Sequence, residues 1–240
     1  MQVLLTGSTR GIGKAISELL LENGYPVIGT SRSTINDYTN NVLYQHIECD
    51  LADPEQVIKL KKVFSQDEAP EVLINNAAIF EDADFGISDE AWLSNWDRTM
   101  QVNLRSAALL CKWAINAWKE QGIEGRIINI ASRAASRGDT QEYASYAASK
   151  AGMVALTKSI ARGFGKAGIT AYSIAPGFVN TEMAMESIKI YGEEYLTKDL
   201  VLNEIVPPSQ IAELVLLLIS GKLTHATGQT FHINSGSYLV

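Results

Sequence analysis

The stretch Thr6-Gly7-Ser8-Thr9-Arg10-Gly11-Ile12-Gly13 joins a short apolar run at residues 2–6 to a segment with helical spacing of its apolar residues at 11–23. Glycines in such a strand-to-helix turn let the backbone approach a pyrophosphate, and the free N–H groups at the helix N-terminus favour anions. Three residues separate the first two glycines and one separates the last two, so the spacing differs from the common dinucleotide fingerprint. A turn that serves only packing is the alternative. With its flanks, the stretch favours a phosphate-binding turn.

The rest of the chain repeats this order of strand and helix. Apolar runs predict strands at residues 2–6, 26–30, 42–48, 72–75, 126–131, 170–175 and 230–234, and helical patterns lie at 11–23, 54–66, 89–119, 145–164 and 209–220. Each parallel pair of strands needs a crossover, so we predict a doubly wound parallel sheet (the Rossmann fold) of about seven strands with helices on both faces. No linker or repeat divides the chain, and residues 1–240 are expected to form a single domain. The mixed segment 178–207 is expected to be a substrate lid.

Composition narrows the class of protein. The 240 residues carry a formal net charge of −7, with Lys and Arg spread thinly, so neither a nucleic acid nor a membrane is expected as a partner. The brief apolar start is neither a signal peptide nor a spanning segment. Cys49 and Cys111 have no His or Cys at metal-ligand spacing, and we expect neither a metal site nor a disulfide. A cytoplasmic protein is the expectation.

The end of the second predicted strand bears on which dinucleotide would bind. In this fold an acid about twenty residues beyond the glycines holds the adenosine ribose 2′-hydroxyl. Here the chain reads Gly29-Thr30-Ser31-Arg32-Ser33, without an acid, and Arg10 lies in the glycine turn. Two guanidiniums suit a 2′-phosphate, so NADP(H) is expected in preference to NAD(H), although each arginine alone reads as a solvated charge. Asp50 is placed to accept a hydrogen bond from the adenine amine or to cap the next segment.

Tyr146 and Lys150 lie four residues apart in a segment with helical spacing, so the phenol and the ammonium share one face of a helix. A phenol titrates near ~10 in water, and work as a proton donor and acceptor at neutral pH requires retuning by roughly three units. A fixed neighbouring cation favours the phenolate. Alone the pair is weak evidence, because this spacing occurs by chance on many helices.

Further motifs stand in a fixed order along the chain, namely Thr6-Gly7-x-x-x-Gly11-x-Gly13, Asn75-Asn76-Ala77-Ala78, Asn103, Ser132, Tyr146-x-x-x-Lys150 and Pro176-Gly177. In this order they resemble the short-chain dehydrogenase/reductase family over nearly the whole chain. The final segment, residues 226–240, is most similar to the 3-oxoacyl-acyl-carrier-protein reductase branch. The ordered set is very specific for family and poorly specific for substrate.

The resemblance implies a role for each catalytic motif. Tyr146 would be the general acid in carbonyl reduction and the general base in alcohol oxidation. Lys150 would lower the pKa of Tyr146 and bind the nicotinamide ribose, and Ser132 would hydrogen-bond the substrate oxygen. Asn103 would hold a water that links Lys150 to solvent, and a kink is expected there because Asn is a poor helix former. Alone, Ser132 reads as a turn residue and Asn103 as a packing amide.

The residues expected to bind the cofactor come from the glycine turn, the strand ends and the family motifs. They are Gly7, Ser8, Thr9, Arg10, Gly11, Ile12, Gly13, Ser31, Arg32, Asp50, Leu51, Asn76, Ala77, Ala78, Tyr146, Lys150, Pro176, Gly177, Val179 and Thr181.

Two departures from the family pattern concern the site. Ala78 replaces the usual glycine, which adds strain if this position needs a positive φ or close cofactor approach. The loop between Ser132 and Tyr146 is one residue longer than in many members and would border the substrate. In that loop, Arg133 and Arg137 are candidates to attract an anionic substrate or an acyl-carrier phosphopantetheine. Solvated or ion-paired arginines are the alternative.

The expected function is an NADPH-dependent oxidoreductase that interconverts a carbonyl and a secondary alcohol by hydride transfer, with 3-oxoacyl reduction as a candidate. A non-catalytic NADP-binding sensor or scaffold is the alternative, and the chain is short for a sugar-nucleotide epimerase or dehydratase. The expected partners are a small carbonyl or alcohol substrate and, as a candidate, an acyl-carrier protein. The resemblance favours a homo-oligomer, a tetramer or dimer, in which tryptophans of the long helix cover an interface. Core packing explains those tryptophans as well.

Overall fold

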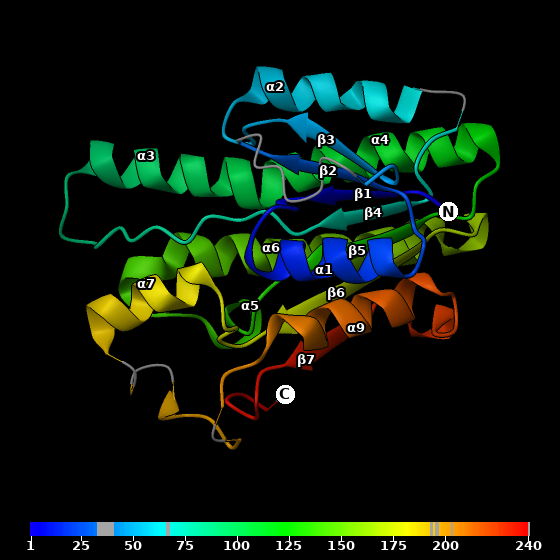
Figure 1. Cartoon of the computed structure of the whole chain (residues 1–240). Coiled ribbons are helices and arrows are strands. Elements are labelled where there is room, and N and C mark those ends of the chain that lie inside the picture. The colour runs from blue at the N-terminus through cyan, green and yellow to red at the C-terminus, as the bar shows by residue number, and fades with distance from the viewer. Residues whose placement is uncertain (33–40, 66–67, 193, 195–196, 203, 240) are drawn as a thin grey trace.

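A computed structural model describes residues 1–32, 41–65, 68–192, 194, 197–202 and 204–239. In that part of the chain a parallel sheet has the strand order β3-β2-β1-β4-β5-β6-β7 (Figure 1). Its strands are β1 Val3–Thr6, β2 Val27–Ser31, β3 Tyr44–Glu48, β4 Val72–Asn75, β5 Arg126–Ile130, β6 Thr170–Pro176 and β7 Thr230–Ile233. The predicted doubly wound sheet is therefore confirmed, and every predicted strand is present within two residues of its expected ends.

Helices cover both faces of the sheet (Figure 1). One face carries α1 Gly11–Glu22 and α9 Pro208–Ile219, and the other carries α2 Pro54–Lys59, α4 Ser106–Gln121 and α6 Ala144–Phe164. Successive strand residues point to opposite faces. Leu4 accordingly packs in the core under α4 and α6, whereas Val3 and Leu5 pack under α1 and α9. Because both faces of the sheet are covered, the strands are continuous apolar runs in the sequence. Each fully buried aliphatic side chain contributes about 1.5–3 kcal/mol to the stability of the fold.

The long helix expected at residues 89–119 is divided in the structure. Helix α3 Asp89–Met100 continues through a π-helical turn, Gln101–Arg105, into α4. Asn103 lies in this turn, with its Oδ1 accepting from the Ile79 backbone N–H at 2.9 Å and its Nδ2 donating to the Ile79 carbonyl at 3.0 Å. The extra residue in the turn aims the amide at a neighbouring strand end. The helix is thus irregular at the position where a kink was expected.

Short helices that the sequence pattern did not predict lie beside the carboxyl ends of the strands. They are α5 Ala134–Arg137, a 3-10 helix at Gln141–Tyr143 and α7 Glu182–Tyr191. A single turn such as α5 is too short to show a period of 3.6 residues. A second 3-10 helix, Leu60–Ser65, continues α2 where a longer helix was expected. None of the described helices is both long enough and apolar enough to cross a membrane.

Candidate active site

The glycine turn after β1 is fixed by its own backbone. Gly7 and Gly11 have φ values of 68° and 53°, which glycine adopts without strain. A Cβ on Gly13 would lie 1.9 Å from the Gly7 carbonyl oxygen, so only glycine lets α1 approach the turn this closely. Arg10 at the N-cap makes no side-chain cap hydrogen bond, and the first turn of α1 holds no acid. The N–H groups at this helix end therefore suit an anion, as the pyrophosphate of a dinucleotide requires.

Asn76 fastens this turn to the end of β4. Its Nδ2 donates to the carbonyls of Thr6 and Gly7, each at 3.0 Å, and its backbone N–H donates to Thr6 Oγ1 at 3.0 Å. Among described residues other than glycine, Ser235 alone has a positive φ. Ala78 therefore avoids the backbone strain that a positive φ would have caused.

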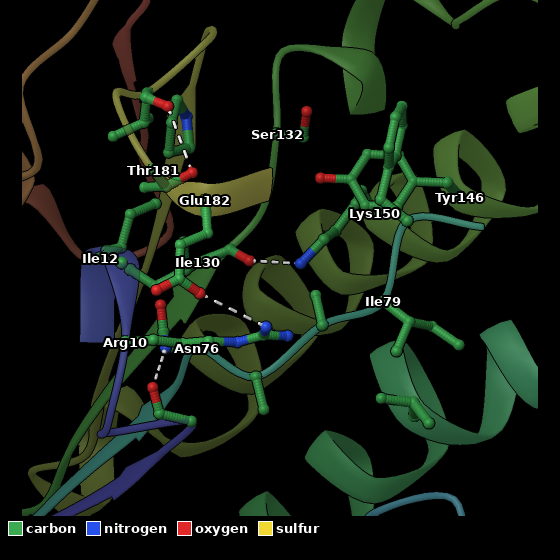
Figure 2. A pocket seen from close by; sticks show the side chains of 18 of the residues that line it. Arg10, Ile12, Asn76, Ile79, Ile130, Ser132, Tyr146, Lys150, Thr181 and Glu182 are labelled. Atoms are coloured by element: carbon green, nitrogen blue, oxygen red, sulfur yellow. Dashed lines mark hydrogen bonds and ion pairs between the residues drawn. The ribbon is translucent and has the colours of Figure 1, made fainter. Parts of the chain in front are cut away.

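A cavity of about 610 Å³ opens where the chain connections from β1 and β4 diverge. Such a switch point is where doubly wound sheets bind ligands. The walls bring together most of the residues expected to bind the cofactor, namely Gly7, Thr9, Arg10, Gly11, Ile12, Ser31, Arg32, Asp50, Leu51, Asn76, Ala77, Ala78, Tyr146, Lys150, Pro176, Gly177, Val179 and Thr181. Figure 2 shows Arg10, Ile12 and Asn76 on one side of this space and Ser132, Tyr146 and Lys150 on the other.

Two residues expected to bind the cofactor stand behind the cavity wall. Ser8 is fully buried, and its Oγ lies 2.8 Å from the Tyr44 hydroxyl. Gly13 packs on the Gly7 carbonyl, as described above. Both residues pack behind the residues that line the cavity. A linear motif does not distinguish the two sides of such a turn.

Ser31 at the end of β2, Arg32 directly after it and Arg10 of the glycine turn line the cavity, and these residues were expected to hold the adenosine end of the cofactor. Arg10 Nη1 lies 3.7 Å from the Glu182 carboxylate at the start of α7, with both side chains largely exposed. Asp50 also lines the cavity, and its Oδ1 accepts from the Ala52 backbone N–H at 2.9 Å. Asp53 is the N-cap of α2, whereas Asp50 caps the turn before that helix through this hydrogen bond.

Ser132, Tyr146 and Lys150 converge on one end of the cavity (Figure 2). Lys150 Nζ donates to the Ile130 carbonyl at 2.7 Å and lies 5.8 Å from the centroid of the Tyr146 ring. The Ser132 hydroxyl hydrogen-bonds Tyr146, and Ser132 Oγ accepts from the Ala134 backbone N–H at 3.1 Å. Ser132 follows β5, and the other two residues lie one turn apart on α6. The predicted juxtaposition of these three side chains is present.

Burial shifts the two titrating groups in opposite directions. Desolvation raises the pKa of Tyr146 to about 12, the hydrogen bond with Ser132 opposes the rise, and the negative charge of Asp139 adds to it. Desolvation also lowers the pKa of Lys150 to about 7. Lys150 is not among the causes of this shift, and its expected lowering of the Tyr146 pKa stays a prediction. At neutral pH Tyr146 thus holds its proton.

Asn103 stands outside the cavity wall and supports it. Besides its two hydrogen bonds to Ile79, its Nδ2 donates to Ser149 Oγ at 3.1 Å, and that hydroxyl donates to the Tyr146 carbonyl at 2.7 Å. Asn103 therefore connects the π turn, the segment after β4 and the first turn of α6. The water relay expected of Asn103 stays a prediction.

Aromatic residues that the sequence reasoning missed hold Tyr146 in place. The Phe80 ring meets the Tyr146 ring edge-on, with centroids 4.8 Å apart, and stacks on Tyr143 at 3.9 Å. Phe80 lines the cavity and follows the Asn75-to-Ala78 motif by two residues, which was the available signal. Edge-to-face packing restricts rotation of the Tyr146 ring.

The loop after Ser132 supplies charged groups of both signs. Arg133 is 5% exposed and lines the cavity, with its guanidinium carbon 4.4 Å from the Phe178 ring centroid. Asp139 lines the same cavity, and burial raises the pKa of its carboxyl. Arg137 Nη1 lies 4.0 Å from the Asp199 carboxylate. Arg133 thus lines the cavity and Arg137 does not, although the sequence analysis gave both the same candidate role.

Among the described residues, no group of three or more His, Cys, Asp or Glu side chains is arranged to hold a metal ion. The two cysteines are buried thiols, and burial raises the pKa of Cys49 to about 11 and that of Cys111 to about 12. Neither thiol is a reactive thiolate at neutral pH.

Comparison with known proteins places this geometry in context. The model of a family described as enoyl-(acyl carrier protein) reductase matches residues 7–237. The chain is 35% identical to the 3-oxoacyl-acyl-carrier-protein reductase of Vibrio cholerae, covering 99% of this chain and 97% of that protein. The corresponding enzyme of Escherichia coli is 32% identical with the same coverage.

Solved structures agree with these relatives. A 4-hydroxyisoleucine dehydrogenase complexed with NADH superposes with a TM-score of 0.89 at 28% identity, covering 98% of each chain. The same type of enzyme complexed with NADH and succinate gives a TM-score of 0.85 at 30% identity, again with 98% coverage of both chains. The fold of this chain is thus shared with dehydrogenases whose structures hold NADH.

Proposed function

The chain belongs to the short-chain dehydrogenase/reductase family and is an NAD(P)-dependent oxidoreductase, and from this premise we propose that it uses NADP(H) to reduce a carbonyl compound to a secondary alcohol. The observation that carries the proposal is the convergence of Ser132, Tyr146 and Lys150 at one end of the cavity. In the reverse direction the same residues would oxidise the alcohol.

The residues divide the chemistry between them. The nicotinamide, when bound, supplies or accepts the hydride at the carbonyl carbon. Ser132 donates a hydrogen bond to the carbonyl oxygen and fixes it beside Tyr146. The Tyr146 hydroxyl, protonated at neutral pH because burial raises its pKa to about 12, gives its proton to that oxygen as the carbon is reduced. Hydride and proton together convert C=O to CH–OH, so the reaction balances.

Lys150 has two tasks in this proposal. Its Nζ is held on the Ile130 carbonyl in the cavity wall, where it would donate to ribose hydroxyls of the cofactor. After Tyr146 has given up its proton, a protonated Lys150 stabilises the phenolate and helps return a proton to it. A pKa of about 7 lets Lys150 gain and lose a proton near neutral pH.

A preference for NADP(H) over NAD(H) is supported by the adenosine end of the cavity. Ser31 and Arg32 line it where β2 ends without an acid, and Arg10 lines it from the glycine turn. A carboxylate at the end of β2 would repel a 2′-phosphate, whereas guanidiniums bind one in bidentate fashion. The test is kcat/KM for NADPH and NADH in wild type and Arg32→Gln. We expect the variant to lose roughly tenfold or more with NADPH and little with NADH, and equal losses would contradict the preference.

The 3-oxoacyl reductases among the relatives make an acyl thioester on a carrier protein one candidate substrate, and the 4-hydroxyisoleucine dehydrogenases make a small hydroxy acid another. Residues 178–207, which include α7, would close over either substrate as a lid. The family resemblance supports a homo-oligomer, to be measured by light scattering.

The decisive experiment is NADPH oxidation with a panel of ketones, 3-oxoacyl thioesters and oxo acids, using wild type and Tyr146→Phe. We expect turnover by the wild type and a loss of roughly a hundredfold or more in the variant, which keeps the ring but removes the proton donor. Tightness of NADPH binding, measured by fluorescence, controls for folding of the variant. Undiminished turnover by Tyr146→Phe would overturn the mechanism.

A further inference from the structure

One buried cation lies at the substrate end of the cavity. Arg133 directly follows Ser132, its backbone N–H donates to the Pro176 carbonyl at 2.9 Å, and its side chain is 5% exposed. The Phe178 ring lies beneath its guanidinium at 4.4 Å. These contacts come from β6 and the segment after it, so the side chain is held between two strand ends. The guanidinium therefore has a fixed place in the cavity wall.

A guanidinium keeps its proton at every physiological pH, so the wall carries a permanent positive charge. Burying such a charge costs free energy unless it interacts with an opposite charge or with hydrogen-bond acceptors. Two other cations of the region have different surroundings, since Lys150 donates to the Ile130 carbonyl and Arg137 pairs with Asp199 outside the cavity wall. Asp139 offers the opposing charge within the wall. Asp139 interacts with Arg133, and both residues line the cavity.

We propose, on the basis of the function proposed above, that the substrate is a small oxo acid or hydroxy acid and that Arg133 binds its carboxylate. The carbonyl or alcohol oxygen of the substrate then lies between Ser132 and Tyr146. A carboxylate matches the planar fork of a guanidinium in bidentate geometry. The Phe178 ring packs against one face of the guanidinium and helps to hold it in place.

This arrangement distinguishes a small acid from a carrier-bound acyl thioester. The thioester has no charge near the reacting carbonyl, and its phosphate is separated from that carbonyl by the whole length of the pantetheine arm. A cation one residue from Ser132 is placed for a charge within a few bonds of the carbonyl. A thioester would offer the Arg133 guanidinium no opposite charge close to the reacting carbonyl.

The first experiment compares acids with their neutral amides, which have nearly the same size. NADPH oxidation is measured with acetoacetate and acetoacetamide, and with 4-oxopentanoate and 4-oxopentanamide. We expect kcat/KM of the wild type to favour at least one acid over its amide by about tenfold or more. Equal kcat/KM for acid and amide in both pairs would overturn the assignment, and this comparison requires no variant.

The second experiment changes the cation. In Arg133→Gln we expect kcat/KM for the preferred acid to fall about 100-fold while that for the amide stays within about threefold, because only the acid uses the charge. Arg133→Lys keeps the positive charge but lacks the planar guanidinium, and its kcat/KM for the acid should lie between the values of wild type and Arg133→Gln. Arg137→Gln is the matched control on the same short helix, and both substrates should stay within about threefold of wild type.

The outcomes separate the two proposals. If the wild type oxidises NADPH with neutral ketones or thioesters as well as with acids, the carboxylate assignment fails and the proposed function survives. If no carbonyl compound of either panel is turned over, the proposed function fails. Melting temperature and NADPH binding show whether Arg133→Gln is folded, and if it is not, the acid-to-amide ratios of wild type and Arg133→Lys decide.

Discussion

At the scale of single residues, burial sets the resting protonation state of the site. Tyr146 and Lys150 lie one helical turn apart, yet desolvation raises the pKa of the phenol and lowers that of the amine. Burial therefore favours the neutral form of both groups. A neutral phenol is the form that donates a proton during reduction.

The charge of Asp139 gives a test at this scale. Because Asp139 raises the pKa of Tyr146, Asp139→Asn should lower it and move the alkaline limb of kcat for reduction to lower pH. The profile is measured at saturating NADPH with a neutral substrate. Glu142→Gln on the same loop is the control, and its alkaline limb should stay at the wild-type position. An unchanged or raised limb in Asp139→Asn would refute the assignment.

Lys150 links stability to pH. Its pKa is about 7 in the folded chain and about 10.4 when exposed, so between these values the unfolded state holds more protons. The free energy of unfolding of wild type, relative to Lys150→Met, should therefore rise with pH by up to about 1.4 kcal/mol per unit in that window. Below pH 7 both states are protonated, and the difference levels off. Urea unfolding at pH 6, 7 and 9 measures it, and a flat difference from pH 7 to 9 contradicts the shift.

At the scale of elements, the site depends on how helices end and bend. Helix α1 begins on a turn shaped by Gly13, and α6 is tied through Ser149 to the π turn that contains Asn103. In both cases a residue behind the cavity wall positions those in it.

Gly13 and Gly163 make a matched pair of helical glycines. A Cβ at Gly13 would lie 1.9 Å from the Gly7 carbonyl, whereas Gly163 on α6 has open space around it. Gly13→Ala should therefore weaken NADPH binding by roughly tenfold or more and destabilise the fold by about 1–3 kcal/mol. Gly163→Ala should stabilise the chain by up to about 1 kcal/mol without changing NADPH binding. Urea unfolding and fluorescence titration measure both, and equal effects would disprove the packing role.

Asn103 gives the corresponding test for the π turn. Asn103→Ala removes three hydrogen bonds and leaves the Ile79 N–H and carbonyl without that amide, so we expect a loss of about 3 kcal/mol in the free energy of unfolding. Asn116→Ala, on the exposed side of α4, is the control and should change it by less than about 0.5 kcal/mol. Similar values for the two variants, read from urea unfolding, would contradict the bridging role.

At the scale of the whole molecule, the cavity exists because strands from both halves of the sheet end at one edge (Figure 1). The glycine turn comes from one half, and Ser132 and Arg133 come from the other. The start of α7 reaches across to the turn through the pair of Glu182 with Arg10. Cofactor and substrate residues thus belong to one continuous space.

This cross-molecule pair has a testable consequence. Glu182→Gln removes a carboxylate that competes with a phosphate for Arg10, so the Kd for NADPH should fall by about twofold to fivefold, more at low salt than at high salt. The Kd for NADH should change less. Fluorescence titration at two salt concentrations measures both, and Glu22→Gln at the exposed end of α1 is the control. Weaker NADPH binding by Glu182→Gln would contradict the competition.

The sequence determined the elements and the identity of most groups in the site. Periods of two and 3.6 residues are local properties, so they located the strands, α1, α6 and α9, and the ordered motifs identified Ser132, Tyr146 and Lys150. The unfavourable placement of Asn in a helix even located the π turn. The short helices α5 and α7 were not predicted, because a few turns in a segment of mixed composition show no clear hydrophobic period.

Only the tertiary structure decided which residues line the cavity and which pack behind its wall. Ser8 and Gly13 were read as ligand-binding but support the turn from behind, and Phe80 was overlooked although its ring packs against Tyr146. Arg133 and Arg137 look equivalent in the sequence, yet one is buried in the cavity wall and the other pairs with Asp199. Burial and electrostatic environment depend on contacts between distant segments, and those contacts form only when the chain has folded.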